Sequence, residues 1–350
     1  MKTRVAVVIP CYKVRQSILK VISEIAEDDV WRIYVIDDFC PDGSGDFVEQ
    51  NCNDPRVLIL RNESNQGVGG AVMAGYKQAI TDGAEVIVKI DGDGQMDAAL
   101  IPAFVAPIIR GEADYTKGNR FFEIETVRQM PKVRLIGNIG LSFLTKLSSG
   151  YWNLFDPTNG YTAISSAVAE HLPFDKISRR YFFESDVLFR LNTLRAVAMD
   201  IPMFAEYGAE LSNLSVRREL PRFFFKNLRN VCKRIIYNYF IRNFSYATLE
   251  LIFGFIFFTF GLLYGGLSWI EHSQLALFAS PGTVMLAALP TILGIQLILG
   301  FVNYDMASVP TIPLQGRLHA DARVYDTNRN QLFSANQQSP SAQQKQKLAP

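Results

Sequence analysis

The sequence predicts an α/β domain with a mostly parallel sheet, followed by an amphipathic helix and two membrane-spanning helices. Three patterns lead to this fold class. Short apolar strands alternate with helical stretches from Val5 to about Asp200, a basic helical segment follows Pro221, and two long uncharged segments come after it. The hydrophobic content of 49% is high for a wholly soluble protein. The net charge of +1 says nothing about nucleic acid, but no basic run with interleaved aromatic residues occurs in the first 200 residues, which argues against nucleic acid as a partner.

Each predicted strand of the sheet is a short run rich in apolar residues. The strands are Val5–Ile9, Ile33–Ile36, Val57–Leu60, Val86–Ile90, Tyr115–Lys117 and Tyr161–Ile164. The predicted helices between them are Gln16–Glu27, Gly67–Asp82 and Ala98–Arg110. In such sheets, ligands bind outside the carboxyl ends of the strands, so the loops after the first, second and fourth strands are the expected places for chemistry.

The cysteines and the N-terminus bear on the compartment of the protein. Cys11, Cys40, Cys52 and Cys232 have neither CxxC spacing nor a nearby histidine, which argues against zinc and favours a reducing compartment. The apolar run that begins at Val5 is too short for the core of a signal peptide. We interpret it as the first buried strand.

A basic segment that follows the α/β domain has apolar residues at helical spacing. They are Phe224, Leu228, Val231, Ile235 and Tyr239. Lysine and arginine residues interrupt this stripe, and no acidic residue lies between Pro221 and Arg242. The pattern predicts a helix that lies on an anionic membrane surface. The alternative is a surface helix packed on its own domain.

Two uncharged segments near the C-terminus predict membrane spans. Leu251–Ile270 is long enough as a helix to cross the hydrocarbon core of a bilayer, and Gly282–Val302 is similar. The connection between them has no lysine or arginine, whereas six basic residues lie between Arg222 and Arg242. The positive-inside tendency therefore predicts a multi-pass protein of the cell membrane, with the α/β domain and the C-terminus in the cytoplasm. Two buried core helices are the alternative.

These patterns divide the chain into four parts. We predict the α/β domain over 1–215, the amphipathic juxtamembrane helix over 216–244 and the two-span hairpin over 245–304. The remaining 305–350 is polar and rich in Gln, Ser and Asn, which predicts disorder. Two spans make a thin anchor, so association into a homo-oligomer is physically reasonable.

Asp91 and Asp93 are the most informative residues of the chain. They follow the predicted strand Val86–Ile90 in a loop broken by glycines, and a spacing of two places both side chains on one face of an extended backbone. Carboxylate oxygens at such a point suit Mg²⁺ or Mn²⁺, and such an ion suits a substrate that carries a diphosphate. A solvated turn is the alternative for this pair taken alone.

The loop that contains Asp91 can be interpreted together with the residues at the other predicted strand exits. With Pro10-Cys11-Tyr12, Asp37-Asp38 and Asn65-Gln66-Gly67, it resembles the family 2 glycosyltransferases of the GT-A fold over roughly the first 210 residues. The resemblance implies binding of a nucleotide-diphospho-sugar by seven residues, with Asp38 accepting a hydrogen bond from the base. These are Pro10, Tyr12, Asp37, Asp38, Asn65, Gly67 and Asp91. It also implies a Mg²⁺ or Mn²⁺ site made by Asp91, Asp93 and Gln95. One departure is Lys13-Val14, where the family commonly has Asn-Glu.

Within that family, the two predicted spans and the run Asp91-Gly92-Asp93-Gly94-Gln95 resemble the polyprenyl-phosphate glycosyltransferases, relatives of dolichol-phosphate mannose synthase. Lys117-Gly118-Asn119-Arg120-Phe121 stands where that group has a Gly-Ser-Arg-Phe motif. The resemblance makes Asp93 and Arg120 the catalytic residues, and Arg120 a ligand of the acceptor phosphate, a task that its planar fork of donors suits. A surface salt bridge is the alternative for Arg120.

Further residues are expected around the acceptor. Arg217 and Arg218 are placed to attract the lipid phosphate, although contact with membrane headgroups is an equal alternative. Asp156 lies in a segment that looks like the Asp-x-x-Ser-Gly-Phe segment of the group. Glu184 and Asp186 stand where many family members place a base, but a lipid phosphate is already mostly a dianion at neutral pH. We therefore expect Glu184 and Asp186 to organise the acceptor site from behind, with a purely structural role as the alternative. Asp156 is expected to stand behind the site as well.

The function that follows is an inverting transfer of a hexose from a nucleotide-diphospho-sugar to polyprenyl phosphate, undecaprenyl or dolichyl. One alternative is a processive polysaccharide synthase, but the Arg-Trp pair of those enzymes is absent from the sequence and two spans are few for a channel. Another is a catalytically inactive, membrane-anchored protein that binds a nucleotide sugar. The sequence leaves the sugar, the base and the polyprenol open.

Overall fold

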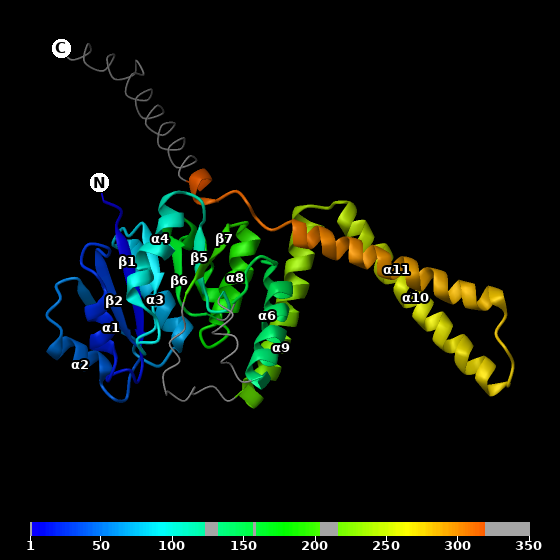
Figure 1. The fold of residues 1–350 in the computed structure, drawn as a ribbon, viewed down its shortest axis with the longest axis horizontal. Coiled ribbons are helices and arrows are strands. Elements are labelled where there is room, and N and C mark those ends of the chain that lie inside the picture. Colours follow the sequence, from blue (N-terminus) through cyan, green and yellow to red (C-terminus); the bar gives the residue numbers. More distant parts are fainter. Residues whose placement is uncertain (1, 123–131, 157–158, 204–215, 319–350) are drawn as a thin grey trace, which may run out of the picture.

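A single sheet forms the centre of the N-terminal part of the chain, and two long helices of the C-terminal part project away from it (Figure 1). This computed structural model describes residues 2–122, 132–156, 159–203 and 216–318. Of residues 132–136, 138 and 216–220, only the backbone is described.

Seven strands of the described residues pair in the order β3-β2-β1-β4-β6-β5-β7. They are β1 (Val5–Cys11), β2 (Arg32–Asp37), β3 (Val57–Arg61), β4 (Val86–Lys89), β5 (Tyr115–Asn119), β6 (Thr162–Ser165) and β7 (Ala198–Pro202). β6 runs antiparallel to β4 and β5, and every other pair is parallel. The prediction of a mostly parallel sheet is confirmed, and β7 is a strand that it did not include.

Helices cover both faces of this sheet. They are α1 (Ile18–Glu24), α2 (Ser44–Asn51), α3 (Val68–Thr81), α4 (Ile101–Ile109), α7 (Ser166–Ala169) and α8 (Phe183–Leu194), with short 3₁₀ turns η1 (Ala98–Leu100) and η2 (Phe174–Lys176). Helix α6 (Lys132–Ser149) packs on α8 and on the helix that follows the domain. The predicted helix over Ala98–Arg110 is divided between η1 and α4.

The two faces of the sheet enter two separate cores. Ala6 and Val8 of β1 pack in one core with α3 and α8, whereas Val7 and Ile9 pack in the other with α1 and α4. Successive side chains of a strand point to opposite faces, so a strand that is apolar throughout is buried on both sides. This is why the strands of the sequence appear as continuous apolar runs.

Helix α9 (Val216–Ile235) and the π-helical segment η3 (Ile236–Arg242) follow the α/β domain, and α9 lies beside α6 (Figure 1). Among its described side chains, α9 buries Asn227, Asn230 and Arg234, while Phe224 and Leu228 are 48% and 47% exposed. Asn227 accepts a hydrogen bond from Ser148 at 2.6 Å. The predicted apolar stripe therefore does not pack as one face, because the polar side chains find their partners inside.

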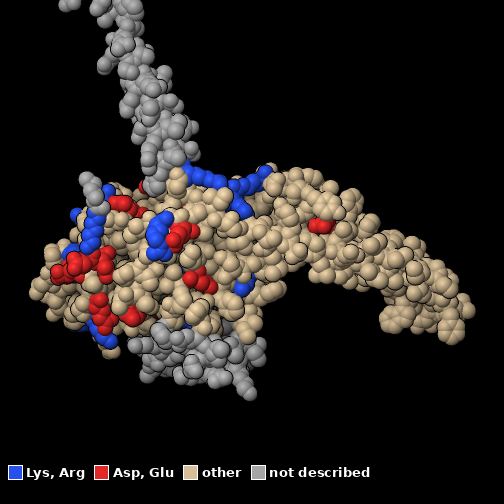
Figure 2. Space-filling model, turned by 45° about the horizontal axis from the view of Figure 1, so that its top comes forward, with Lys and Arg blue, Asp and Glu red and all other residues tan. Residues whose placement is uncertain are grey.

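Helices α10 (Tyr246–Gln274) and α11 (Pro281–Ala307) form an antiparallel hairpin. Both are long and apolar enough to cross a membrane, and little of either is buried within the protein. Figure 2 shows charged side chains over the α/β domain and almost none along the hairpin. The sequence has no lysine or arginine between Arg242 and Arg317.

A buried ion pair joins the base of the hairpin to the rest of the protein. Both guanidinium nitrogens Nη1 and Nη2 of Arg234, on α9, contact the Asp305 carboxylate of α11, at 2.6 and 2.9 Å. Asp305 also accepts hydrogen bonds from Trp152 and Tyr239. Arg234 and Asp305 are each only 2% exposed.

The chain beyond α11 returns to the α/β domain. The backbone N–H groups of Leu314 and Gln315 donate to the carboxylate of Asp114 at 2.7 and 2.8 Å. The side chain of Gln315 is buried, and its amide donates to two backbone carbonyls. Disorder predicted from residue 305 onward is therefore wrong for 305–318, because composition does not reveal that a polar side chain has buried partners. Residues 319–350 lie outside the described residues.

Candidate active site

The carboxyl ends of β2, β1 and β4 lie side by side, because these strands are neighbours and parallel. Pro10 of β1 pairs with Ile36 of β2, and Cys11 pairs with Asp37. Asp91 follows the end of β4 by two residues. The fold thus brings the strand exits that were predicted from sequence to one edge of the sheet.

Asp38 organises the loop that follows β3. Its Oδ1 accepts hydrogen bonds from the side chain of Asn62 and the backbone of Gln66, both at 2.8 Å, and its Oδ2 accepts one from the backbone of Gly67 at 2.7 Å. Asp38 is 2% exposed. A carboxylate has about four acceptor positions, so three are already in use. The structure therefore gives Asp38 a loop-ordering role that the sequence did not indicate, and base recognition by it stays a prediction.

Asn65 and Gly67 lie next to Asp38. The Asn65 amide donates to the backbone oxygen of Asp38 at 3.2 Å. Gly67, at the start of α3, has φ +79°, and a Cβ there would lie 2.8 Å from the backbone oxygen of Arg179. Only glycine combines that backbone conformation with so close a contact. This contact brings the loop after β3 against the segment that leads into α8.

The side chains at the exit of β1 are open to solvent. Tyr12 is 42% exposed, and the ammonium of Lys13 lies 5.5 Å from the centre of its ring. Lys13 occupies the position where the family commonly has Asn, and its backbone has φ 58°. Asp37, at the end of β2, accepts a hydrogen bond from the backbone of Cys40 at 2.8 Å. Phe39, which is 64% exposed, adds an aromatic side chain at this edge that the sequence reasoning missed.

Asp91 contacts a buried lysine. The Nζ of Lys89 lies 2.9 Å from Oδ1 of Asp91 and 3.3 Å from Oε1 of Glu184, and the Lys89 side chain is 1% exposed. Burial lowers the pKa of Lys89, but the two carboxylates outweigh burial and raise this pKa above its usual value. Lys89 is therefore a charged ammonium that joins two predicted site residues. A single lysine within the apolar run Val86–Ile90 was the available sequence signal.

The residues predicted to bind a metal ion offer oxygen donors only. The Asp91 side chain is 28% exposed, Asp93 is also partly exposed, and Gln95 is exposed. Oδ1 of Asp93 accepts a hydrogen bond from the Gln95 backbone at 3.0 Å. Within the described part of the chain, no group of three His, Cys, Asp or Glu side chains converges. Two carboxylates and an amide oxygen fit Mg²⁺ or Mn²⁺ shared with substrate phosphates, because Mg²⁺ is usually bound through one or two carboxylates.

Gly160 closes one side of Asp91. A Cβ at this position would lie 2.5 Å from Oδ2 of Asp91 and 2.6 Å from Nζ of Lys89. A side chain at residue 160 would therefore displace the Asp91 carboxylate. The segment before β6 approaches the loop after β4 this closely because the two strands are neighbours.

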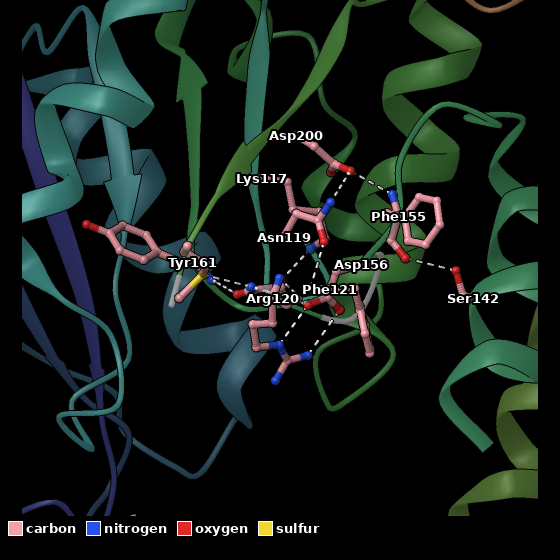
Figure 3. A network of polar contacts seen from close by, with 11 residues as sticks. Lys117, Asn119, Arg120, Phe121, Ser142, Phe155, Asp156, Tyr161 and Asp200 are labelled. Carbon is pink, nitrogen blue, oxygen red and sulfur yellow. Dashed lines mark hydrogen bonds and ion pairs between the residues drawn. The ribbon is translucent and has the colours of Figure 1, made fainter. Parts of the chain in front are cut away.

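Arg120 is held by Asp156 (Figure 3). Its Nε and Nη2 donate to the two carboxylate oxygens of Asp156 at 2.7 and 3.0 Å. Asp156 is fully buried, whereas the Arg120 side chain is 27% exposed. A two-point contact of this kind determines the plane of the guanidinium as well as its position. Asp156 thus lies behind Arg120, and its role at an acceptor site stays a prediction.

A buried polar network continues from Arg120 into the sheet (Figure 3). Asp200 of β7 accepts hydrogen bonds from the Asn119 side chain at 3.2 Å and the Phe155 backbone at 2.7 Å. Burial raises the pKa of Asp200 to about 6 and lowers the pKa of Lys117 to about 8. Lys117 donates to the backbone oxygen of Asn159. No pattern in the sequence indicated a role for Lys117 or Asp200.

The remaining predicted residues lie on α8 and α9. Asp186 accepts hydrogen bonds from the Ser178 backbone at 2.8 Å and from Asn230 of α9 at 3.1 Å, so it ties α8 to α9. Glu184 lies in the first turn of α8 and contacts Lys89. The side chains of Arg217 and Arg218 lie outside the described residues, and their backbone belongs to the start of α9.

The site consists of carboxylates and an arginine at strand exits. The sheet that carries them is mostly parallel and has helices on both faces. Together these features define an α/β domain of the GT-A type. Residues 6–172 match the family described as Glycosyl transferase family 2. This stretch therefore belongs to family 2, and the protein is a glycosyltransferase.

Two similar proteins illustrate the relationship. UDP-N-acetylglucosamine–dolichyl-phosphate N-acetylglucosaminyltransferase of Methanococcus voltae is 29% identical over 217 residues, which cover 57% of this chain and 86% of the relative. Undecaprenyl-phosphate mannosyltransferase of Micrococcus luteus is 29% identical over 206 residues, which cover 57% of this chain and 82% of the relative.

A solved structure confirms the fold. Glucosyl-3-phosphoglycerate synthase from Mycobacterium tuberculosis, crystallised with Mn²⁺, UDP-glucose and phosphoglyceric acid, matches with a TM-score of 0.50 and 16% sequence identity. The match covers 67% of this chain and 80% of that chain. At this identity the likeness shows the fold alone.

Proposed function

We propose that this protein transfers a hexose, with inversion, from a nucleotide-diphospho-sugar to polyprenyl phosphate, and that the product is a polyprenyl-monophosphate sugar. The observation that carries the proposal is the placement of Asp156 and Gly160. Asp156 contacts Arg120, and Gly160, four positions later, lies so near Asp91 that a Cβ on it would be 2.5 Å from the carboxylate. A carboxylate suited to the donor and a guanidinium suited to a phosphate acceptor thus lie at the two ends of one short segment. The relatives that are named for transfer to dolichyl or undecaprenyl phosphate support the same acceptor class.

The donor half of the proposed site lies at the exits of β1, β2 and β4. Tyr12 offers an exposed ring and Asp37 a carboxylate beside the expected base, while Asp38 holds the loop of Asn65 and Gly67 in place. Asp91, Asp93 and Gln95 would hold Mg²⁺ or Mn²⁺. A bound ion of this kind supplies a positive charge that neutralises the departing nucleoside diphosphate.

The acceptor half centres on Arg120. Its contact with buried Asp156 presents the guanidinium in one orientation, which suits two-point binding of phosphate oxygens. A lipid phosphate is mostly a dianion at neutral pH, so its oxygen needs positioning rather than deprotonation. Attack on the face of the anomeric carbon opposite the diphosphate then gives inversion. Arg217 and Arg218, at the start of α9, would attract the lipid phosphate.

We further propose that α9 lies on the membrane surface and that α10 and α11 cross the bilayer. The outward face of α9 carries Phe224, Phe225 and Leu228, which are 48%, 67% and 47% exposed. Aromatic residues outside and polar residues inside are what a helix between a protein and a lipid surface requires. The contacts of Leu314 and Gln315 with Asp114 support a topology with the chain beyond α11 on the same side as the catalytic domain.

Turnover in membranes tests the proposal. The protein, reconstituted in vesicles with Mn²⁺ and polyprenyl phosphate, should convert at least one of a panel of UDP- and GDP-sugars into a glycolipid, whose anomeric configuration is then read by NMR. Asp93→Asn should abolish glycolipid formation. Asp97→Asn is the matched control, because Asp97 caps η1 from the same loop and asparagine caps equally well. Absence of glycolipid with every donor, together with equal Mn²⁺ binding by the Asp93→Asn protein, would refute the proposal.

A further inference from the structure

Lys89 is a buried charge in a position where an apolar residue would fit. Its neighbours Val86, Ile87 and Val88 are all buried apolar residues of β4. Replacement of a buried ion pair by apolar residues of similar volume is often neutral or stabilising, so a contribution to stability does not explain the presence of this lysine. Its contacts point to the site instead, because both of its carboxylate partners belong to it.

The two partners of Lys89 come from different halves of the proposed site. Asp91 lies at the start of the loop after β4, in the donor half, and its Oδ1 lies 2.9 Å from the Lys89 ammonium. Glu184 lies in the first turn of α8, which Asp186 joins to α9 through Asn230. A continuous set of contacts therefore runs from the helix proposed to lie on the membrane, through α8, to the donor carboxylate.

We propose that Lys89 is a positioning residue, which holds the donor carboxylate Asp91 and the acceptor-side carboxylate Glu184 at one separation through a single buried ammonium. This inference rests on the proposed function for the identity of the two halves. A lysine can serve here because its ammonium has three donors in a compact head, so it can contact two carboxylates from beneath without occupying the site itself. Gly160 lies against both the Asp91 carboxylate and the Lys89 ammonium, since a Cβ there would be 2.5 Å from Oδ2 of Asp91 and 2.6 Å from Nζ of Lys89, and this leaves the pair little freedom to move apart.

Loss of the Lys89 ammonium should separate the donor half of the site from the acceptor half, while each half keeps its own structure. In a Lys89→Met protein the side chain keeps its length, Asp91 keeps the contact with Gly160, and α8 keeps its contact with α9. The loop after β4 and the first turn of α8 are then no longer joined by a shared ion pair. Misplacement of reacting groups by about 1 Å can cost a hundredfold in rate.

Hydrogen exchange and turnover together test the inference on the full-length protein in vesicles. We expect Lys89→Met to increase amide exchange in residues 91–97 and in the first turn of α8, and to lower kcat for glycolipid formation by roughly ten- to a hundredfold. It should also raise the ratio of sugar-nucleotide hydrolysis to lipid glycosylation. Lys89→Arg should retain protection in both segments, and Lys77→Met, on the exposed side of α3, should match the wild type in every measurement.

A coupling measurement separates positioning from general support of the fold. If one ammonium joins the two carboxylates, Glu184→Gln should add little to the loss caused by Lys89→Met, whereas two independent roles would give additive losses. Unchanged exchange in both segments of the Lys89→Met protein would overturn the inference, whatever the activity. Failure of the wild-type protein to form any glycolipid would overturn the proposed function instead, and the exchange data would still decide the connection made by Lys89.

Discussion

The buried pair of Arg234 and Asp305 gives a prediction whose size follows from the structure. The carboxylate accepts hydrogen bonds from both Nη atoms of Arg234, from Trp152 and from Tyr239. Arg234→Met removes two of these four donors and leaves a buried carboxylate without its countercharge. Breaking one side of such a pair costs about 3–5 kcal/mol. For a domain of this size, that loss lowers the unfolding midpoint by about 10 °C.

A second substitution tests whether charge is the cause. In the Arg234→Met protein, Asp305→Asn removes the unpaired charge and keeps an oxygen that can accept from Trp152 or Tyr239. We expect it to restore about 2 kcal/mol, or roughly half of the lost midpoint, although Asp305→Asn alone is destabilising because it leaves Arg234 buried without a carboxylate. The two changes are thus strongly non-additive.

Thermal unfolding in lipid nanodiscs, followed by tryptophan fluorescence, measures these differences. Arg229→Met is the matched control, because Arg229 lies on the exposed face of the same helix and should leave the midpoint within about 1 °C of the wild type. The reasoning fails if Asp305→Asn destabilises the Arg234→Met protein further. In that case the residues act independently, and the pair does not anchor the hairpin through its charge.

Three further predictions concern the site, the returning chain and pH. Arg120→Lys should raise KM for polyprenyl phosphate about tenfold in initial-rate measurements, because lysine cannot make the two-point contact with Asp156; an unchanged KM would contradict this. Gln315→Ala should increase protease cleavage between Val309 and Leu318, detected by mass spectrometry, because two buried hydrogen bonds are lost. Burial lowers the pKa of Lys117 to about 8 from 10.5. Between these two values the unfolded chain binds the proton and the folded protein does not, so the free energy of unfolding should fall by roughly 2 kcal/mol as pH is lowered from about 10 to 8. Lys117→Met should remove that slope in denaturant titrations.

Six of the strands could be predicted from short runs rich in apolar residues, and β7 could not. β1, β2 and β4 have largely apolar runs because helices cover both sides of the sheet there, whereas β3, at the edge, is partly exposed. β7 contains Asp200 and ends in Pro202, which are poor strand residues, and pairs with β5 because tertiary contacts outweigh that preference. Helix α2 begins at Ser44 after Gly43 and continues with Gly45, a composition typical of turns.

Some residues of the candidate site could likewise be predicted from the sequence, and others could not. Positions at strand exits could be predicted, because adjacent parallel strands bring their carboxyl ends together. Contacts between distant parts of the chain could not be. Lys89 and Glu184 are 95 positions apart, and Arg120 and Asp156 are 36 apart. No spacing rule relates such pairs, so Lys89 could be noticed in sequence only as a lone charge in an apolar strand.

The contacts at the base of the hairpin explain how a mobile lipid acceptor could be served by a catalytic domain that is tied to its anchor. Arg234 connects the base of α11 to α9, and Leu314 and Gln315 connect the chain beyond α11 to Asp114. On the proposed membrane placement, these contacts hold the catalytic domain at one height and tilt above the bilayer. A polyprenyl phosphate can diffuse sideways but its isoprenoid stays in the bilayer, so its phosphate reaches a restricted range of heights. Arg120 must therefore lie within that range for binding to occur, and flexible attachment would spread its position over many ineffective ones. A rigid base of the hairpin is the arrangement that such an acceptor requires.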